Sequence, residues 1–130
     1  MDVVQIMKEA KRPLILTGAL FKDFDLAIEL SEALNAHIAA TGNSIAGFRD
    51  RGFENASKEW ISEIVNWVCI PEWKGLDGKG KPDLLIFMGY HPYLLKRMLS
   101  TLSNFSECRT VVLEKENLEK AVKYIKEEGE

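Results

Sequence analysis

The sequence predicts an α/β protein, a three-layer α/β/α sandwich built on a parallel sheet of about four strands. Short and almost continuous apolar runs, typical of strands buried on both faces, alternate with segments of helical period. Three of these runs end at a glycine, Gly18, Gly42 or Gly89, which suits a sharp turn from a strand into the next segment. Right-handed crossovers between parallel strands place helices on both faces of the sheet. The strand order that we expect for such a doubly wound sheet is 2-1-3-4.

The expected elements follow one another along the whole chain. A helix after Asp2 starts with a pattern similar to a capping box, since Gln5 lies three residues on. Asn35 ends the next helix, Ser57 caps a third, and Pro92 opens a fourth. The expected strands are 13–17, 37–41, 83–88 and 109–113. The expected helices lie near 2–10, 23–34, 57–68, 92–105 and 118–125.

Length and composition favour one globular domain over residues 1–130. The chain has 46% hydrophobic and 28% charged residues, as in a protein that buries a core. Its net charge of −3 gives no general attraction to nucleic acid or anionic lipid. We see no membrane-spanning stretch, no secretory signal and no metal-binding spacing of the two cysteines, Cys69 and Cys108. These features predict a cytoplasmic protein that binds no metal itself.

A small-molecule cleft is expected beyond the carboxyl ends of the strands, where open parallel sheets bind ligands. The glycines at three strand ends have polar or aromatic neighbours that can hydrogen-bond a ligand. The candidate cofactor-binding residues are Gly18, Thr41, Gly42, Asn43, Ser44, Gly89, Tyr90 and His91. Loops between strands and helices need such residues even without a ligand, so both interpretations stay open.

Catalytic and phosphate-binding motifs are missing. The run from Gly75 to Lys81 fits seven positions of a P-loop, but Pro82 replaces the magnesium-binding hydroxyl and a strand follows in place of a helix. No GxGxxG follows the first strand, and no serine or cysteine has an evident base. His37 opens the second strand on the side away from the cleft, which favours a structural role. We therefore predict no catalytic residue in this chain.

Three tryptophans within fourteen residues suggest a contact surface. Trp60 shares the apolar helix face and is expected in the core. Trp67 and Trp73 lie off that face, and such aromatic residues often anchor interfaces.

Several segments, in order and at similar spacing, resemble the epsilon subunit of the archaeal acetyl-CoA decarbonylase/synthase, the carbon monoxide dehydrogenase complex. The segments are 13–18 (PLILTG), 40–48 (ATGNSIAGF), 73–80 (WKGLDGKG), 83–89 (DLLIFMG) and 99–105 (LSTLSNF). The resemblance covers about residues 8–113. After Leu113 the chain departs from the family pattern, because residues 114–117 (EKEN) lead almost directly into the last helix.

The resemblance implies a Rossmann-like fold similar to the NAD/FAD-binding domain of deoxyhypusine synthase. It also implies a non-catalytic accessory subunit that stabilises the large nickel and iron–sulfur subunit, its expected partner, or helps to pass electrons to a flavin. Self-association into a homo-oligomer is a further expectation. The alternative is a free-standing module for electron transfer that binds FAD or another nucleotide, because strands ending in glycine suit such a ligand.

Overall fold

A five-stranded, entirely parallel sheet forms the centre of the computed structural model, which describes residues 2–128. Its order is β3-β2-β1-β4-β5, so the four expected strands adopt the expected order and one further strand joins at the edge. The strands are β1 (Pro13–Thr17), β2 (His37–Thr41), β3 (Ala56–Glu59), β4 (Leu84–Met88) and β5 (Arg109–Val112). The expected α/β fold with a Rossmann-like layout is confirmed, with five strands in place of about four.

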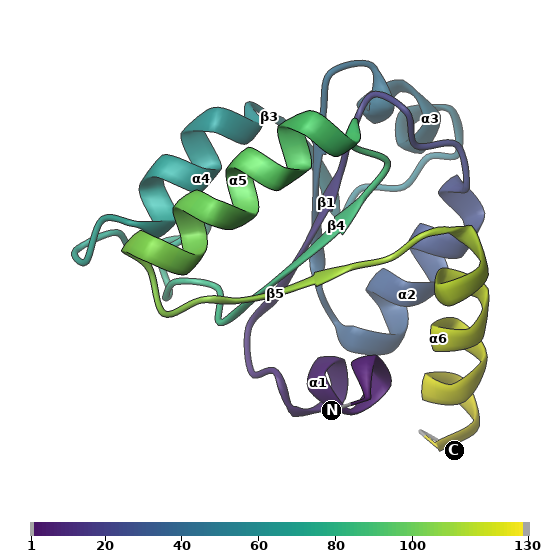
Figure 1. The fold of residues 1–130 in the computed structure, drawn as a ribbon. Coiled ribbons are helices and arrows are strands. Elements are labelled where there is room, and N and C mark those ends of the chain that lie inside the picture. The colour runs from purple at the N-terminus through teal and green to yellow at the C-terminus, as the bar shows by residue number, and fades with distance from the viewer. Residues whose placement is uncertain (1, 129–130) are drawn as a thin grey trace.

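Helices cover both faces of the sheet (Figure 1). In that view α4 and α5 lie on one side of β1, β4 and β5, and α1, α2 and α6 lie on the other. The helices are α1 (Val3–Glu9), α2 (Phe24–Leu34), α3 (Ser44–Asp50), α4 (Ile61–Val68), α5 (Pro92–Phe105) and α6 (Lys115–Glu128). Two hydrophobic layers result, one between the sheet and each group of helices.

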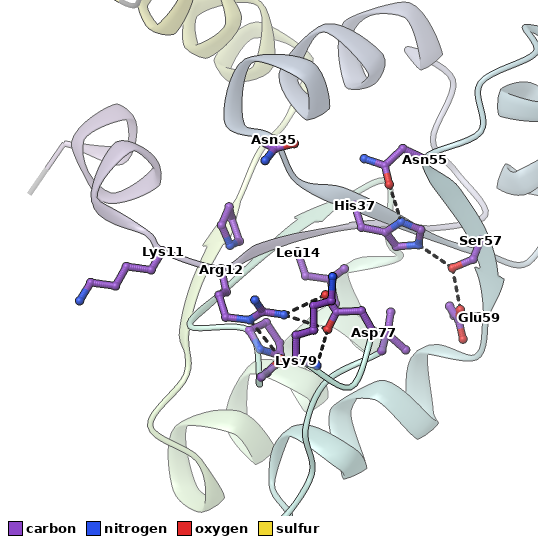
Figure 2. Close-up of a pocket in the computed structure, with 14 residues that line it drawn as sticks. Lys11, Arg12, Leu14, Asn35, His37, Asn55, Ser57, Glu59, Asp77 and Lys79 are labelled. Carbon is purple, nitrogen blue, oxygen red and sulfur yellow. Dashed lines mark hydrogen bonds and ion pairs between the residues drawn. The ribbon is translucent and has the colours of Figure 1, made fainter.

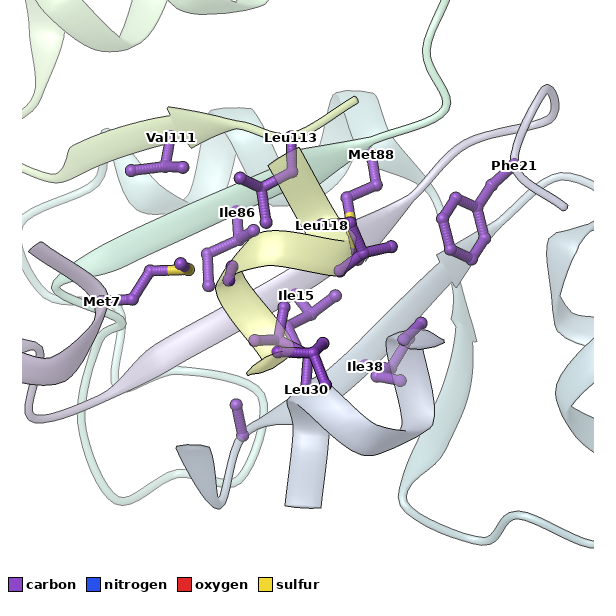
Figure 3. Packing of buried hydrophobic residues seen from close by; sticks show 14 of the residues in the cluster. Met7, Ile15, Phe21, Leu30, Ile38, Ile86, Met88, Val111, Leu113 and Leu118 are labelled. Atoms are coloured by element: carbon purple, nitrogen blue, oxygen red, sulfur yellow. The ribbon is translucent and has the colours of Figure 1, made fainter. Parts of the chain in front are cut away.

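The larger layer packs α1, α2, α3 and α6 against one face of the sheet (Figure 3). Alternate strand residues such as Ile15, Ile38 and Ile86 point into it, because successive side chains of a strand face opposite ways. Met7 of α1 and Leu30 of α2 are fully buried against them. Every residue of β4 is buried, which explains why this segment reads as a continuous apolar run.

The second layer lies under α4 and α5. Leu14, Leu16 and Phe87 from the sheet meet Ile64 of α4 and Leu102 of α5. No helix of the described residues is long and apolar enough to cross a membrane.

The helix ends follow local rules that the sequence signals. Asp2 accepts a hydrogen bond from the Val4 backbone N–H at 3.2 Å, while Gln5 bonds Glu9 and does not complete a capping box. Asn35 has φ of 52°, the left-handed conformation that ends α2. The His91 ring accepts from the Tyr93 N–H at 3.4 Å at the start of α5.

The segment around Ser57 was expected to begin a helix, and this is wrong. Ser57 lies in β3, which pairs with β2, and the following helix starts only at Ile61. Trp60 consequently precedes the helix and is 67% exposed, so its expected place in the core is also wrong. Trp67 and Trp73 contact each other, with ring centroids 5.6 Å apart, beside the layer under α4 and α5.

Candidate functional site

The loops that follow β1 and β4 meet at the carboxyl edge of the sheet. This is the switch point of the sheet, because the chain continues from β1 to β2 on one side, whereas β4 lies on the other side of β1. The Gly18 N–H donates to the Met88 carbonyl at 2.8 Å, and the Leu20 N–H donates to the Gly89 carbonyl at 3.0 Å. These two bonds continue the pairing of β1 with β4 beyond the strands. The crevice in which such folds hold a ligand is therefore closed by backbone between these two strands.

Gly18 and Gly89 allow this close approach. A Cβ atom on Gly18 would lie 2.4 Å from the Gly89 carbonyl oxygen and 2.7 Å from the Tyr90 ring. Gly89 has φ of +77°, and a Cβ there would lie 2.4 Å from the Phe21 Cβ. Both glycines are thus needed for packing of loop against loop.

A chain of hydroxyl groups ties β1, β2 and the loop after β4 together. Thr41 Oγ1 donates to the Thr17 carbonyl at 2.7 Å and lies 3.0 Å from the Tyr90 hydroxyl. Ser44 Oγ lies 2.7 Å from the Thr41 carbonyl and 3.0 Å from Thr17 Oγ1. Thr17, Thr41 and Ser44 are all buried. Their side chains hydrogen-bond one another and the backbone, so they face the interior of the protein.

Burial raises the pKa of the Tyr90 phenol well above its usual value, and the Thr41 hydrogen bond opposes this only in part. The Tyr90 ring packs edge-on against Phe87, with centroids 5.8 Å apart. Tyr90 thus stays neutral at physiological pH and holds a fixed position at the end of the sheet.

Three other candidate residues lie at the same edge but reach solvent. Gly42, with φ of +61°, turns the chain after β2, and Asn43 follows it without capping α3 through its side chain. His91 caps α5 and is exposed. The structure thus brings all eight candidates to one edge of the sheet. Their role in binding a cofactor stays a prediction.

A cavity of about 520 Å³ opens at this edge, beside the closed crevice. Gly89 and Tyr90 are the two candidates that line it. Its other walls come from the loop after β1, the start of α5 and the turn between β5 and α6, including Leu20, Lys22, Leu95, Leu113 and Lys115. Sequence reasoning missed these residues, because no glycine or polar motif marks the turn after β5.

The chemistry available at this edge is limited. Among residues 2–128, no group of three or more His, Cys, Asp or Glu side chains could hold a metal ion. The buried hydroxyls have hydrogen-bond partners, and no histidine reaches them as a base. The adjoining cavity is lined by two lysines, Lys22 and Lys115, by two carboxylates, Asp23 and Glu114, and by three aromatic rings, Phe21, Phe87 and Tyr90.

Residues 1–126 match the family described as CO dehydrogenase beta subunit/acetyl-CoA synthase epsilon subunit. Individual relatives are named acetyl-CoA decarbonylase/synthase complex subunit epsilon. The chain is 44% identical to that of Methanothrix soehngenii over 106 residues, which cover 78% of this chain and 56% of the relative. It is 38% identical to subunit epsilon 1 of Archaeoglobus fulgidus over 117 residues, or 86% of this chain and 63% of the relative.

A third relative, subunit epsilon 1 of Methanosarcina barkeri, is 32% identical over 121 residues, which cover 90% of this chain and 70% of the relative. The chain therefore spans between about half and about two thirds of the length of these curated relatives.

Proposed function

Since the chain belongs to the CO dehydrogenase beta subunit/acetyl-CoA synthase epsilon subunit family, we propose that it is a non-catalytic accessory subunit of the carbon monoxide dehydrogenase component. Its partner in this proposal is the large nickel and iron–sulfur subunit, which it stabilises.

The chain of hydroxyl groups at the carboxyl edge is the observation that supports a non-catalytic role. The hydrogen bonds of these hydroxyls hold loops together: they join the side chains of Thr41, Tyr90 and Ser44 to one another or to backbone carbonyls. A nucleophile needs a base within hydrogen-bond reach, and these hydroxyls have carbonyls and other hydroxyls there instead. The edge is built as a rigid support.

Exposed apolar side chains at the same edge support docking to a large partner. Leu20 after β1, Trp60 after β3 and Tyr93 at the start of α5 are 57%, 67% and 69% exposed. Aromatic side chains are enriched at the centres of protein interfaces, where they supply much of the binding energy. We place the contact with the large subunit on these three residues.

Heating the purified large subunit under anaerobic conditions, with and without this chain, tests the stabilising role. We expect the half-life of carbon monoxide oxidation to lengthen when the chain is present at a concentration well above its dissociation constant. A Trp60→Ala/Tyr93→Ala variant should lose the effect. Phe105→Ala, which alters an equally exposed aromatic residue at the far end of α5, should keep it. An unchanged half-life with the unaltered chain would contradict the proposal.

Electron transfer to a flavin is the second candidate function, and the 520 Å³ cavity favours it. Its volume lies within the ~300–1,000 Å³ range of small-molecule sites, and it combines apolar walls with two lysines and two carboxylates, Asp23 and Glu114. Titration with FAD should raise the melting temperature if the cavity binds it, and a Lys22→Ala/Lys115→Ala variant should weaken that effect. A melting temperature that is unchanged at millimolar FAD would exclude the isolated chain as a flavin carrier.

A further inference from the structure

The outer edge of β5 carries backbone groups that have no partner within residues 2–128. β5 ends the strand order and pairs with β4 alone, and in Figure 1 it leads from α5 to α6. Just after the strand, the Leu113 N–H donates to the Phe87 carbonyl at 3.0 Å. Because alternate residues of a strand direct their backbone groups to opposite sides, the N–H and C=O groups of Thr110 and Val112 point away from the sheet.

The side chains of β5 are typical of a strand that pairs on both sides. Thr110, Val111 and Val112 are β-branched, and Val112 is 36% exposed although it lies in the sheet. Proline, lysine or a bulge commonly protects the edge strand of a monomeric protein. β5 has none of these features, and its one charged residue, Arg109, stands at its start. This edge is therefore suited to pairing with another strand.

The opposite edge of the sheet is less suited to such pairing. In β3 the backbone groups of Ala56 and Lys58 point outward by the same alternation, and the exposed Lys58 places a charge there. The other side chains of β3 bond inward. Ser57 donates to Glu59 at 2.6 Å and lies 2.7 Å from the His37 ring, which holds β3 to β2 (Figure 2).

A second copy of this chain matches the β5 edge. Two β5 strands related by a two-fold axis run antiparallel, and each then supplies the donors and acceptors that the other needs. With Thr110 opposite Val112 of the second copy, the two residues exchange both of their N–H···O=C bonds, and the axis passes by Val111. A contact between β5 and β3 of another copy would be head-to-tail and would not close into a dimer.

The charges that flank β5 favour the antiparallel arrangement. Arg109 begins the strand and Glu114 follows its end. Glu107 and Lys115 lie further out, and all four side chains are exposed. In an antiparallel pair the start of one strand lies beside the end of the other, so opposite charges meet: Arg109 comes near Glu114 of the second copy, and Glu107 comes near Lys115. A parallel pair would bring like charges together.

We propose that the β5 edge is a homodimer interface, through which two copies join their sheets into one continuous sheet. The pairing covers the exposed part of Val112 with Thr110 of the second copy. Because only short strands contribute the hydrogen bonds, the dimer dissociates on dilution. This interface is not the carboxyl edge used in the proposed function, so each proposal can fail without the other.

Analytical ultracentrifugation of the full chain, from micromolar to millimolar concentration, tests the proposal. We expect a monomer that converts to a dimer as the concentration rises. Val112→Lys should raise the dissociation constant of the dimer about tenfold or more, because a lysine at an edge opposes pairing. Leu76→Lys is the matched control. Leu76 is 37% exposed but lines the groove of Figure 2 with residues of β1, β2 and β3, and its substitution should leave the dimer unchanged. A monomer at millimolar concentration, or equal effects of the two substitutions, would overturn the proposal.

Hydrogen exchange of the unaltered chain supplies a second test that needs no substitution. The N–H groups of Thr110 and Val112 should exchange more slowly at the concentrations at which the dimer forms. Those of Ala56 and Lys58, which point outward from β3, should exchange at the same rate at every concentration. Protection of the β3 amides, or of neither pair, would contradict pairing through β5.

Discussion

The Tyr90 hydroxyl lies 3.0 Å from Oγ1 of Thr41 and thereby joins the loop after β4 to the end of β2. β1 lies between these two strands, and Thr41 also donates to the carbonyl of Thr17 in β1. One partly buried hydroxyl pair therefore links three strands at the edge where a partner or ligand would bind.

Tyr90→Phe should destabilise the protein by about 1 kcal/mol, because it removes a partly buried hydrogen bond but keeps the packing of the ring on Phe87. Thermal unfolding should show a lower melting temperature, by a few degrees. Tyr93→Phe is the matched control, since Tyr93 is 69% exposed, and it should leave the melting temperature almost unchanged. Equal effects of the two substitutions would show that the Tyr90 hydroxyl contributes nothing.

Gly18→Ala should cost about 3 kcal/mol, since the new Cβ meets the backbone oxygen of Gly89, which cannot move without separating the loops. Gly52→Ala should cost only about 1 kcal/mol. Gly52 has φ of +66° with nothing within 4 Å, so only backbone strain applies there. Urea unfolding measures both values. A Gly18 variant as stable as the Gly52 variant would mean that the two loops are not in close contact.

Cys108 should react slowly with alkylating reagents. Burial, assisted by the nearby Asp83 carboxylate, raises the pKa of its thiol from 9.0 to about 12. At pH 8 the reactive thiolate should thus be about a thousandfold rarer than in the unfolded chain. A Cys69→Ser variant, which keeps Cys108 as its one thiol, should be alkylated slowly when folded and quickly in urea. Similar rates in the two states would contradict the burial of this thiol.

The same shift affects stability at high pH. The folded state holds the Cys108 proton more tightly than the unfolded state. The resulting contribution to the free energy of unfolding is therefore complete below pH 9 and is lost as the pH rises toward 12. Cys108→Ser should therefore reduce the dependence of the unfolding free energy on pH in this range.

Asp83 should contribute more to the free energy of unfolding than Asp77, although both carboxylates bind the segment before β1. Asp83 accepts from the backbone N–H groups of Lys11 and Arg12 at 2.8 and 2.9 Å. Asp83→Ala should cost about 1–2 kcal/mol in urea unfolding, because it leaves two backbone donors without this partner. Asp77→Ala breaks an exposed ion pair with Arg12 and should hardly change the stability, since solvent screens such pairs. The reverse ranking would be the contradicting result.

The fold was largely predictable from the sequence, because the three inner strands β1, β2 and β4 are short, mostly apolar runs separated by segments of helical period. β3 escaped prediction since Ala56–Glu59 is short and polar. It exists as a strand because it pairs with β2 and because His37 bonds both Asn55 and Ser57, contacts that only the tertiary structure creates. Phe105 continues the helical period of apolar residues in α5, which favours a core position, but it is 70% exposed at the end of that helix.

The sequence predicts the edge of the sheet at which the candidate residues lie, but not how their side chains and loops pack there. Glycines after strands indicate the edge, and the structure brings Gly18 and Gly89 together there. The sequence does not indicate that Thr41 and Ser44 turn inward, or that backbone bonds close the crevice between β1 and β4. Such pairings depend on the register of segments that are far apart in the chain.

Anaerobic affinity purification of the tagged chain from a lysate that contains the large nickel and iron–sulfur subunit tests the central claim most directly. We predict that this polypeptide is recovered in near-equal amount with the chain, and that Trp60→Ala/Tyr93→Ala reduces its recovery while Phe105→Ala does not. Recovery of the unaltered chain without that subunit would contradict its role as an accessory subunit.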